Sequence, residues 1–123
     1  MQRNTAQRRA ICDVFLESGR PLGPTEVHKA ARRRMRRLGI ATVYRAIRDL
    51  LDEGWLALVE LPGQPARYER AGKEHHHHFV CNHCDRVFEV EGCPGDIDAD
   101  VPAGFQLETH DVLLYGRCAT CAA

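Results

Sequence analysis

The chain of 123 residues lacks several features that define common protein classes. No apolar run reaches the roughly 18 residues that a membrane-spanning helix needs, so we expect no transmembrane segment and no membrane partner. The first residues contain no apolar stretch typical of a secretory signal, and we therefore expect a cytoplasmic location. Thiols stay reduced there, so close pairs among the six cysteines are expected to hold metal rather than form disulfides.

Catalytic metal motifs are also missing. The sequence contains neither His-Glu-x-x-His, the helical zinc motif of metalloproteases, nor the His-x-Glu of zinc deaminases. Nothing indicates a small-molecule substrate. We therefore do not expect an enzyme.

The net charge is zero, but the two signs are unevenly distributed. Residues 1–54 contain 12 lysines and arginines against 6 acids, a net charge of +6, whereas residues 55–123 contain 5 against 11, a net charge of −6. A basic half suits contact with DNA phosphates, and an acidic half suits cations or a protein partner. The alternative is ordinary surface charge without a role in binding.

Apolar periodicity predicts three helices and a hairpin in the basic half. We expect helices over residues 6–18, 24–38 and about 41–53, each ended by a glycine. Residues 55–61 and 66–69 read as two strands around a Pro-Gly turn. This order predicts a winged helix-turn-helix, a DNA-binding domain in which the third helix reads the duplex.

The second half predicts a smaller unit. Residues 79–80, 87–90 and 112–115 read as short strands, and residues 93–104 could hold a short helix that two prolines and two glycines weaken. The predicted fold class is α+β, with a winged helix over residues 1–70, a hinge over 71–78 that carries histidines, and a small α/β domain over 79–123.

Two Cys-x-x-Cys pairs carry the strongest chemical signal. Cys81 with Cys84 and Cys118 with Cys121 can place four thiolates around one ion, and we predict a structural Zn²⁺ site there. Redox cysteines are the alternative, but the βαβ context of a thioredoxin-like pair is absent from the predicted elements.

A run of four histidines precedes the first cysteine pair. In an extended segment His76 and His78 point to one side and His75 and His77 to the other, which predicts two metal sites. Candidates for the remaining ligands are Glu69, Glu89, Asp96 and His110. Cys93 is a further candidate ligand, since a thiolate would favour zinc over iron. The alternatives are a solvated polar loop for the histidines and a packed thiol for Cys93.

Three motifs together resemble the ferric uptake regulator (Fur) family of metal-dependent repressors. They are residues 39–45 (Gly-Ile-Ala-Thr-Val-Tyr-Arg), residues 75–84 (the histidine run, Phe79, Val80 and the first cysteine pair) and residues 110–118 (His-x-x-Leu-x-Tyr-Gly-x-Cys). Their order and spacing are specific and cover nearly the whole chain. The resemblance implies a homodimer that binds a palindromic operator in double-stranded DNA when metal is bound, with dimerisation through the second domain.

The resemblance also implies roles for individual residues. The four paired cysteines match the family's structural zinc site. Its sensing site is matched by Glu69, His76, His78 and Glu89, and its additional site by His75, His77, Asp96 and His110. Contacts to DNA fall to Thr42, Tyr44 and Arg45 of the third helix, with Arg3 as a substitute minor-groove contact.

One departure from the family bears on the sensed metal. Pro21 and Leu22 stand where the family carries a sensing histidine, with His28 a weaker substitute. With Cys93, this departure slightly favours zinc as the regulatory divalent metal over Fe²⁺, and genes of metal uptake or homeostasis are the expected targets. An iron- or peroxide-sensing repressor of the same family is the alternative, and a metal store or chaperone is the alternative from another class.

Overall fold

The computed structural model describes residues 5–92 and 101–123, which form two compact units, Met1–Gly72 and Lys73–Ala123. The predicted α+β fold class with an N-terminal winged helix is confirmed. Three predicted site residues, Arg3, Cys93 and Asp96, lie outside the described residues, as does most of the possible helix after Cys93. Among the described helices, none has the length and apolar character needed to cross a bilayer.

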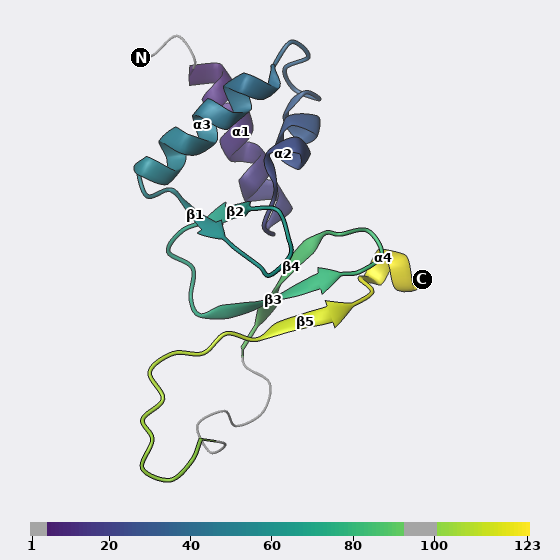
Figure 1. Ribbon diagram of the computed structural model, residues 1–123. Helices are drawn as coiled ribbons and strands as arrows, with labels where there is room; N and C mark the ends of the chain where they lie inside the picture. The colour runs from purple at the N-terminus through teal and green to yellow at the C-terminus, as the bar shows by residue number, and fades with distance from the viewer. Residues whose placement is uncertain (1–4, 93–100) are drawn as a thin grey trace. The chain divides into compact units, whose positions relative to one another are not determined.

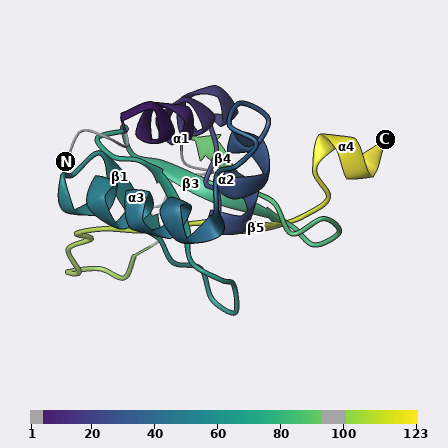
Figure 2. The same cartoon turned by 90° about the horizontal axis from the view of Figure 1, so that it is seen from above.

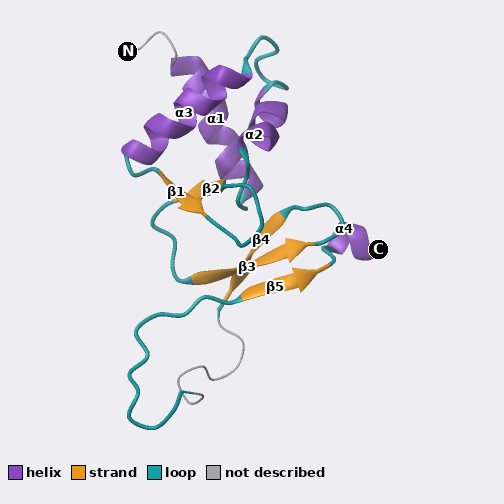
Figure 3. Cartoon of the chain, viewed as in Figure 1, coloured by secondary structure: helices purple, strands orange, loops and turns teal. Residues whose placement is uncertain are grey.

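The first unit consists of three helices and a hairpin (Figures 1 and 3). The helices are α1 (Thr5–Ser18), α2 (Pro24–Ala31) and α3 (Ile40–Asp52), and the antiparallel strands are β1 (Leu56–Val59) and β2 (Arg67–Arg70). The helices lie against one another in both views (Figures 1 and 2). α2 and α3 form the helix-turn-helix, and β1 and β2 form the wing.

A continuous apolar core holds these elements together. Its buried members come from α1, α2, α3, β1 and the connections on either side of α2, and they are Ile11, Val14, Phe15, Leu22, Val27, Ala31, Leu38, Val43, Ile47, Leu50 and Leu56. Trp55 closes one side, with its ring edge-on to Phe15 and the Arg70 guanidinium 4.2 Å from the ring centroid.

The second helix is shorter than predicted. α2 ends at Ala31, seven residues before the predicted end, and Arg33 and Arg34 donate backbone bonds to the carbonyls three positions back. Five arginines in six positions oppose one another at helical spacings of three and four, which disfavours a regular helix. Leu38 still reaches the core, so the apolar pattern identified the packing but not the helix end.

The loop before α2 contains a contact that the sequence did not predict. Leu22 is buried and forms a β-bridge with Tyr68 of the wing, in which each backbone N–H donates to the other residue's carbonyl at 2.9 Å. The loop is therefore fixed to the wing by its backbone.

The second unit is built on a three-stranded sheet in the order β4–β3–β5 (Figure 3). Its strands are β3 (His76–Cys81), β4 (Val87–Glu91) and β5 (Leu113–Gly116), followed by the one-turn helix α4 (Ala119–Ala122). β4 pairs antiparallel and β5 parallel with β3. β3 begins three residues before the predicted strand, so it contains most of the histidine run.

Candidate metal centres and DNA-binding helix

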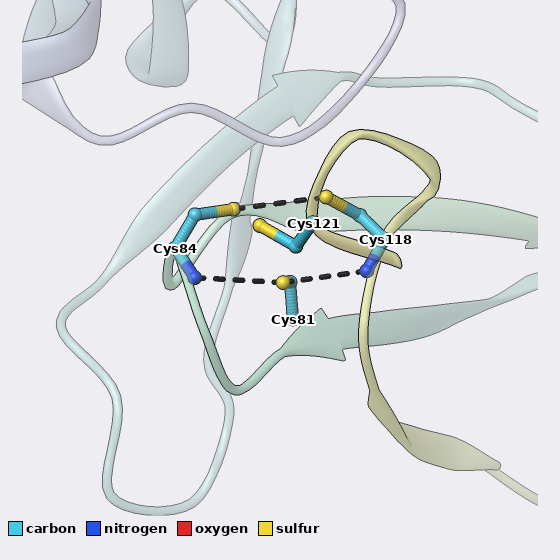
Figure 4. A group of neighbouring side chains, drawn as sticks. All are labelled: Cys81, Cys84, Cys118 and Cys121. Atoms are coloured by element: carbon cyan, nitrogen blue, oxygen red, sulfur yellow. Dashed lines mark hydrogen bonds between the residues drawn. The ribbon is translucent and has the colours of Figure 1, made fainter. Parts of the chain in front are cut away.

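The four paired cysteines converge at one end of the sheet (Figure 4). Cys81 ends β3 and Cys84 lies in the turn that follows, while Cys118 caps α4 and Cys121 lies within it. The turn closes through a bond from the Asp85 N–H to the Cys81 carbonyl at 2.9 Å, with Asp85 at a φ of +64°. Short, tightly bonded segments thus present both pairs to one point.

The spacing of these sulfurs suits a tetrahedral metal ion. All four Sγ atoms lie within 4.8 Å of one another, and those of Cys84 and Cys118 are 3.8 Å apart. A Zn–S bond of about 2.3 Å gives a tetrahedron with an edge of about 3.8 Å. Backbone N–H groups of Cys84 and Cys118 donate to Cys81 Sγ at 3.5 and 3.3 Å, as bonds to a thiolate ligand would.

The thiols of this cluster differ in acidity. Hydrogen bonding from the Cys118 backbone, more than any other cause, lowers the pKa of Cys81 to about 6. The backbone of Cys121 likewise lowers the pKa of Cys118. Burial, followed by the neighbouring thiols, raises the pKa of Cys121 to about 12. Cys81 is therefore the readiest thiolate, and full ionisation of the cluster needs a cation.

The histidines along β3 and just before it fall on two faces, as the alternation of side chains along an extended strand predicts. His76 and His78 lie on one face with ring centroids 5.0 Å apart, and His75 and His77 lie together at 4.5 Å. His76 Nδ1 is 2.8 Å from the Glu74 carbonyl, so it acts as the donor there. In this tautomer Nε2 of His76 carries the lone pair, and most histidine ligands likewise donate their other ring N–H to a carbonyl or carboxylate.

Glu89 and Glu69, the two acidic residues predicted beside His76 and His78, belong to different units. Glu89 on β4 stands directly opposite His78, and its carboxylate forms an ion pair with Lys73. No sequence pattern had singled out Lys73. Glu69 is a buried residue of β2 and belongs to the first unit.

His75, His77 and His110 form a three-imidazole cluster. The Nε2 atoms of His75 and His110 are 3.2 Å apart. Two nitrogens bound at about 2.0–2.1 Å to a tetrahedral ion would be about 3.3 Å apart, so this pair suits Zn²⁺. Asp96, the predicted fourth ligand, lies outside the described residues.

His77 is the most enclosed of these imidazoles, at 1% exposure. Its Nδ1 accepts the Val112 N–H at 3.0 Å, so in the neutral ring the proton sits on Nε2. Burial, followed by repulsion from His75 and His110, lowers the pKa of His77. The ring is kept neutral, but coordination through Nε2 would require that proton to leave, which the Val112 bond opposes.

The outer face of α3 presents the predicted DNA contacts. Tyr44 is 51% exposed, and Arg45 is exposed and donates to the Thr42 hydroxyl at 3.1 Å. Arg48, one turn further on, is also exposed and was not predicted. Because Val43 and Ile47 are buried, the helix orientation is fixed while these polar side chains face outward.

His28, the weaker substitute for the family's loop histidine, has a structural partner instead. Its Nε2 lies 2.9 Å from the Leu38 carbonyl, which it reaches by donating its proton across the turn after α2. Leu22, at the place of that histidine, packs in the core. In this unit the described loop before α2 therefore supplies no imidazole ligand.

Comparison with known proteins agrees with this geometry. The model of the ferric uptake regulator family matches residues 2–115. The chain belongs to the ferric uptake regulator family. It is 30% identical over 124 residues to the ferric uptake regulation protein of Helicobacter pylori, covering 97% of this chain and 81% of that protein. It is 29% identical over 126 residues to the zinc uptake regulation protein of Mycobacterium tuberculosis, covering 97% and 94%.

A solved structure of the Helicobacter pylori ferric uptake regulator, described as having three functional metal-binding sites, is also similar. It superposes with a TM-score of 0.67 at 28% identity, over 96% of this chain and 81% of that one. Family members named for iron and for zinc therefore resemble this chain to nearly the same degree, and the identity of its metal has to be argued from its own residues.

Proposed function

We propose that this protein is a metal-responsive transcriptional repressor that binds a palindromic operator as a homodimer and controls metal uptake or homeostasis genes, with zinc as the preferred sensed metal. The observation that carries this proposal is the alternation of the histidine run along β3, which begins directly after the winged-helix unit. It presents two imidazole pairs on opposite faces, beside a separate four-cysteine cluster.

In this proposal the metal sites have different tasks. The four cysteines hold a structural Zn²⁺ that stabilises the second unit, because a four-thiolate site leaves no open coordination position. The regulatory site takes Glu69, His76, His78 and Glu89, and the additional site takes His75, His77, Asp96 and His110. Coordination by His77 requires its ring to give up the bond from the Val112 N–H. Since Glu69 belongs to the first unit, a regulatory ion would favour one arrangement of the two units and so change DNA affinity.

The DNA is read by α3. Tyr44 suits a thymine methyl group, and Arg45 suits guanine or a phosphate. Thr42, which accepts a hydrogen bond from Arg45, positions that guanidinium. Arg3 would add a minor-groove contact from the N-terminal segment.

Zinc is preferred over iron because of the ligand types. Imidazole ligands suit both metals, but Leu22 removes one imidazole from the family's sensing set and Cys93 offers a softer donor. A response to Fe²⁺ alone would place the protein with the iron- or peroxide-sensing members.

The dimer is supported by one edge of the sheet, where β5 has a neighbouring strand on one side only among the described residues. β5 is an outer strand, and Leu114 and Tyr115 on it are 37% and 52% exposed. An outer strand with exposed apolar side chains suits pairing with a second copy.

Binding to duplex DNA under buffered metal tests the proposal. An operator is first selected from random duplexes with the zinc-loaded protein, and its affinity is then measured at graded free Zn²⁺ and, without oxygen, at graded Fe²⁺. We expect His76→Ala to abolish the zinc response. His83→Ala, which removes an exposed histidine outside the histidine clusters, should keep it.

Three other results would be informative. Binding that does not depend on metal would contradict the sensing mechanism while leaving DNA recognition intact. A response to iron only would contradict the zinc preference. Failure to select any operator would contradict the repressor function itself.

A further inference from the structure

A strongly basic groove lies on the first unit, and none of the residues that line it belongs to a proposed metal site. It has a volume of about 740 Å³ and is open to solvent along α2 and the turn that follows. Seven residues line it, and they are Thr25, His28, Lys29, Arg32, Arg33, Arg36 and Arg37. Five of the seven carry a permanent positive charge, and none is acidic.

The arginine run divides between two tasks. Arg34 is not in the groove, because it turns to α1 and pairs with Asp13 at 3.0 Å and with Glu17. The other four arginines are exposed and form no ion pair with an acid within residues 5–92 and 101–123. One arginine thus fixes the turn to α1, and four face a common space.

Clustering these positive charges is electrostatically unfavourable, and a bound anion would offset the repulsion between them. The four guanidinium groups line one groove, where their like charges repel. If α2 continued, Arg32 and Arg36 would stand one helical turn apart, as would Arg33 and Arg37, and like charges at that spacing destabilise a helix. The early end of α2 is consistent with that repulsion. One guanidinium group can donate two parallel hydrogen bonds to the oxygens of a phosphate. Four such groups beside Lys29 therefore form a binding site for phosphates.

The place of the groove in the fold indicates which phosphates. Its last member, Arg37, precedes the first residue of α3 by three positions, and the turn between them is anchored by the bond from His28 to the Leu38 carbonyl. In helix-turn-helix proteins the helix before the reading helix crosses the DNA backbone. A duplex read by α3 would therefore bring its flanking strand to this groove.

We propose that this groove grips the backbone phosphates that flank the bases read by α3, and that Arg34 takes no part in the grip. The proposal rests on the proposed repressor function and adds a second contact surface to it. The contact is independent of base sequence. It contributes affinity to operator and non-operator DNA alike, and the metal sites only decide when α3 can be presented.

The test compares charge-matched double variants of the full zinc-loaded protein on the selected operator and on a scrambled duplex. Arg33→Ala/Arg37→Ala removes two groove charges, and Arg34→Ala/Arg86→Ala removes two charges outside it. Each phosphate contact contributes about 0.9 to the slope of log affinity against log salt concentration. Because the dimer carries two grooves, the groove variant loses four contacts, and we expect it to lower that slope by about 3.6 on both duplexes, while the control leaves it unchanged.

Two further measurements, on a lysine variant and on pyrophosphate binding, separate the outcomes. Arg33→Lys/Arg37→Lys should restore most of the slope, which excludes misfolding as the cause of its loss. Equal slopes for the groove variant and the control, with normal wild-type binding, would overturn this inference alone. Loss of pyrophosphate binding in the groove variant without any loss of DNA affinity would also overturn it, in favour of a small polyanion. If the wild type selects no operator, that result contradicts the proposed repressor function and not the groove contact alone.

Discussion

Replacing one cysteine of the four-thiolate cluster should unfold the second unit and leave the first intact. In the second unit, the described apolar side chains that are fully buried, cysteines aside, are Val80 and Val87. Each contributes about 1.5–3 kcal/mol by leaving water. A structural zinc site contributes about 10–16 kcal/mol, which exceeds both valines together. Cys118→Ser, or removal of this zinc, therefore takes away the main source of stability of that unit.

The chain offers separate probes for the two units. Trp55 is the single tryptophan and packs in the first unit, so its emission reports that unit alone. Of the described helical residues, 14, 8 and 13 lie in α1, α2 and α3 and 4 in α4, so far-UV circular dichroism also follows the first unit. Trypsin cleavage after Arg86 and Arg117 follows the second.

The expected result is rapid cleavage at Arg86 and Arg117 in Cys118→Ser, with unchanged Trp55 emission and nearly unchanged helical signal. Cys12→Ala is the matched control, since Cys12 is a half-buried thiol of the first unit outside the cluster. It should leave trypsin resistance intact. Resistance of Cys118→Ser at both arginines would refute the reasoning, as would a red shift of Trp55 emission that accompanies cleavage.

Three further predictions concern single side chains. The pKa of His77 is lowered in the folded state, so the unfolded chain binds more protons than the folded chain as pH falls below about 6.5. The free energy of unfolding of the second unit should therefore fall below that pH. Urea unfolding at pH 7.5 and 5.5, after removal of weakly held metal, should show a smaller pH dependence in His77→Gln. Leu50→Ala should cost about 2–5 kcal/mol of first-unit stability, measured by Trp55 emission in urea, because Leu50 is 1% exposed in the helical core; a cost below about 1 kcal/mol would contradict that packing. Arg45→Ala should weaken binding to the selected operator more than to a scrambled duplex at unchanged melting temperature, whereas an equal loss on both would assign Arg45 to phosphate contact.

Local signals explain why most of the first unit was predictable. Gly19 and Gly54 end α1 and α3 in the left-handed region at φ values of +62° and +79°, where glycine is unstrained. Pro24 opens α2, and the Glu26 carboxylate accepts the Gly23 N–H at 3.1 Å in the manner of a capping box. Each signal depends on residues close together in the chain, so the ends of these helices can be predicted from the sequence alone.

The features that the sequence did not predict depend on contacts between distant residues. The bridge between Leu22 and Tyr68 joins segments that share no pattern, and the early end of α2 results from crowded charges competing with a sound apolar pattern. In the second unit, alternation predicted the faces of the histidines, but not that the Val112 N–H would hold the ring of His77.

A zinc titration with and without operator DNA tests the central claim most directly. If metal binding and DNA binding are coupled, linkage requires that operator DNA tighten the regulatory zinc site by the same factor by which zinc tightens DNA binding. We expect the half-saturating free zinc concentration to fall on addition of operator in the wild type and in His83→Ala, and this response to be lost in His76→Ala. An unchanged zinc affinity in the presence of saturating operator would contradict the account.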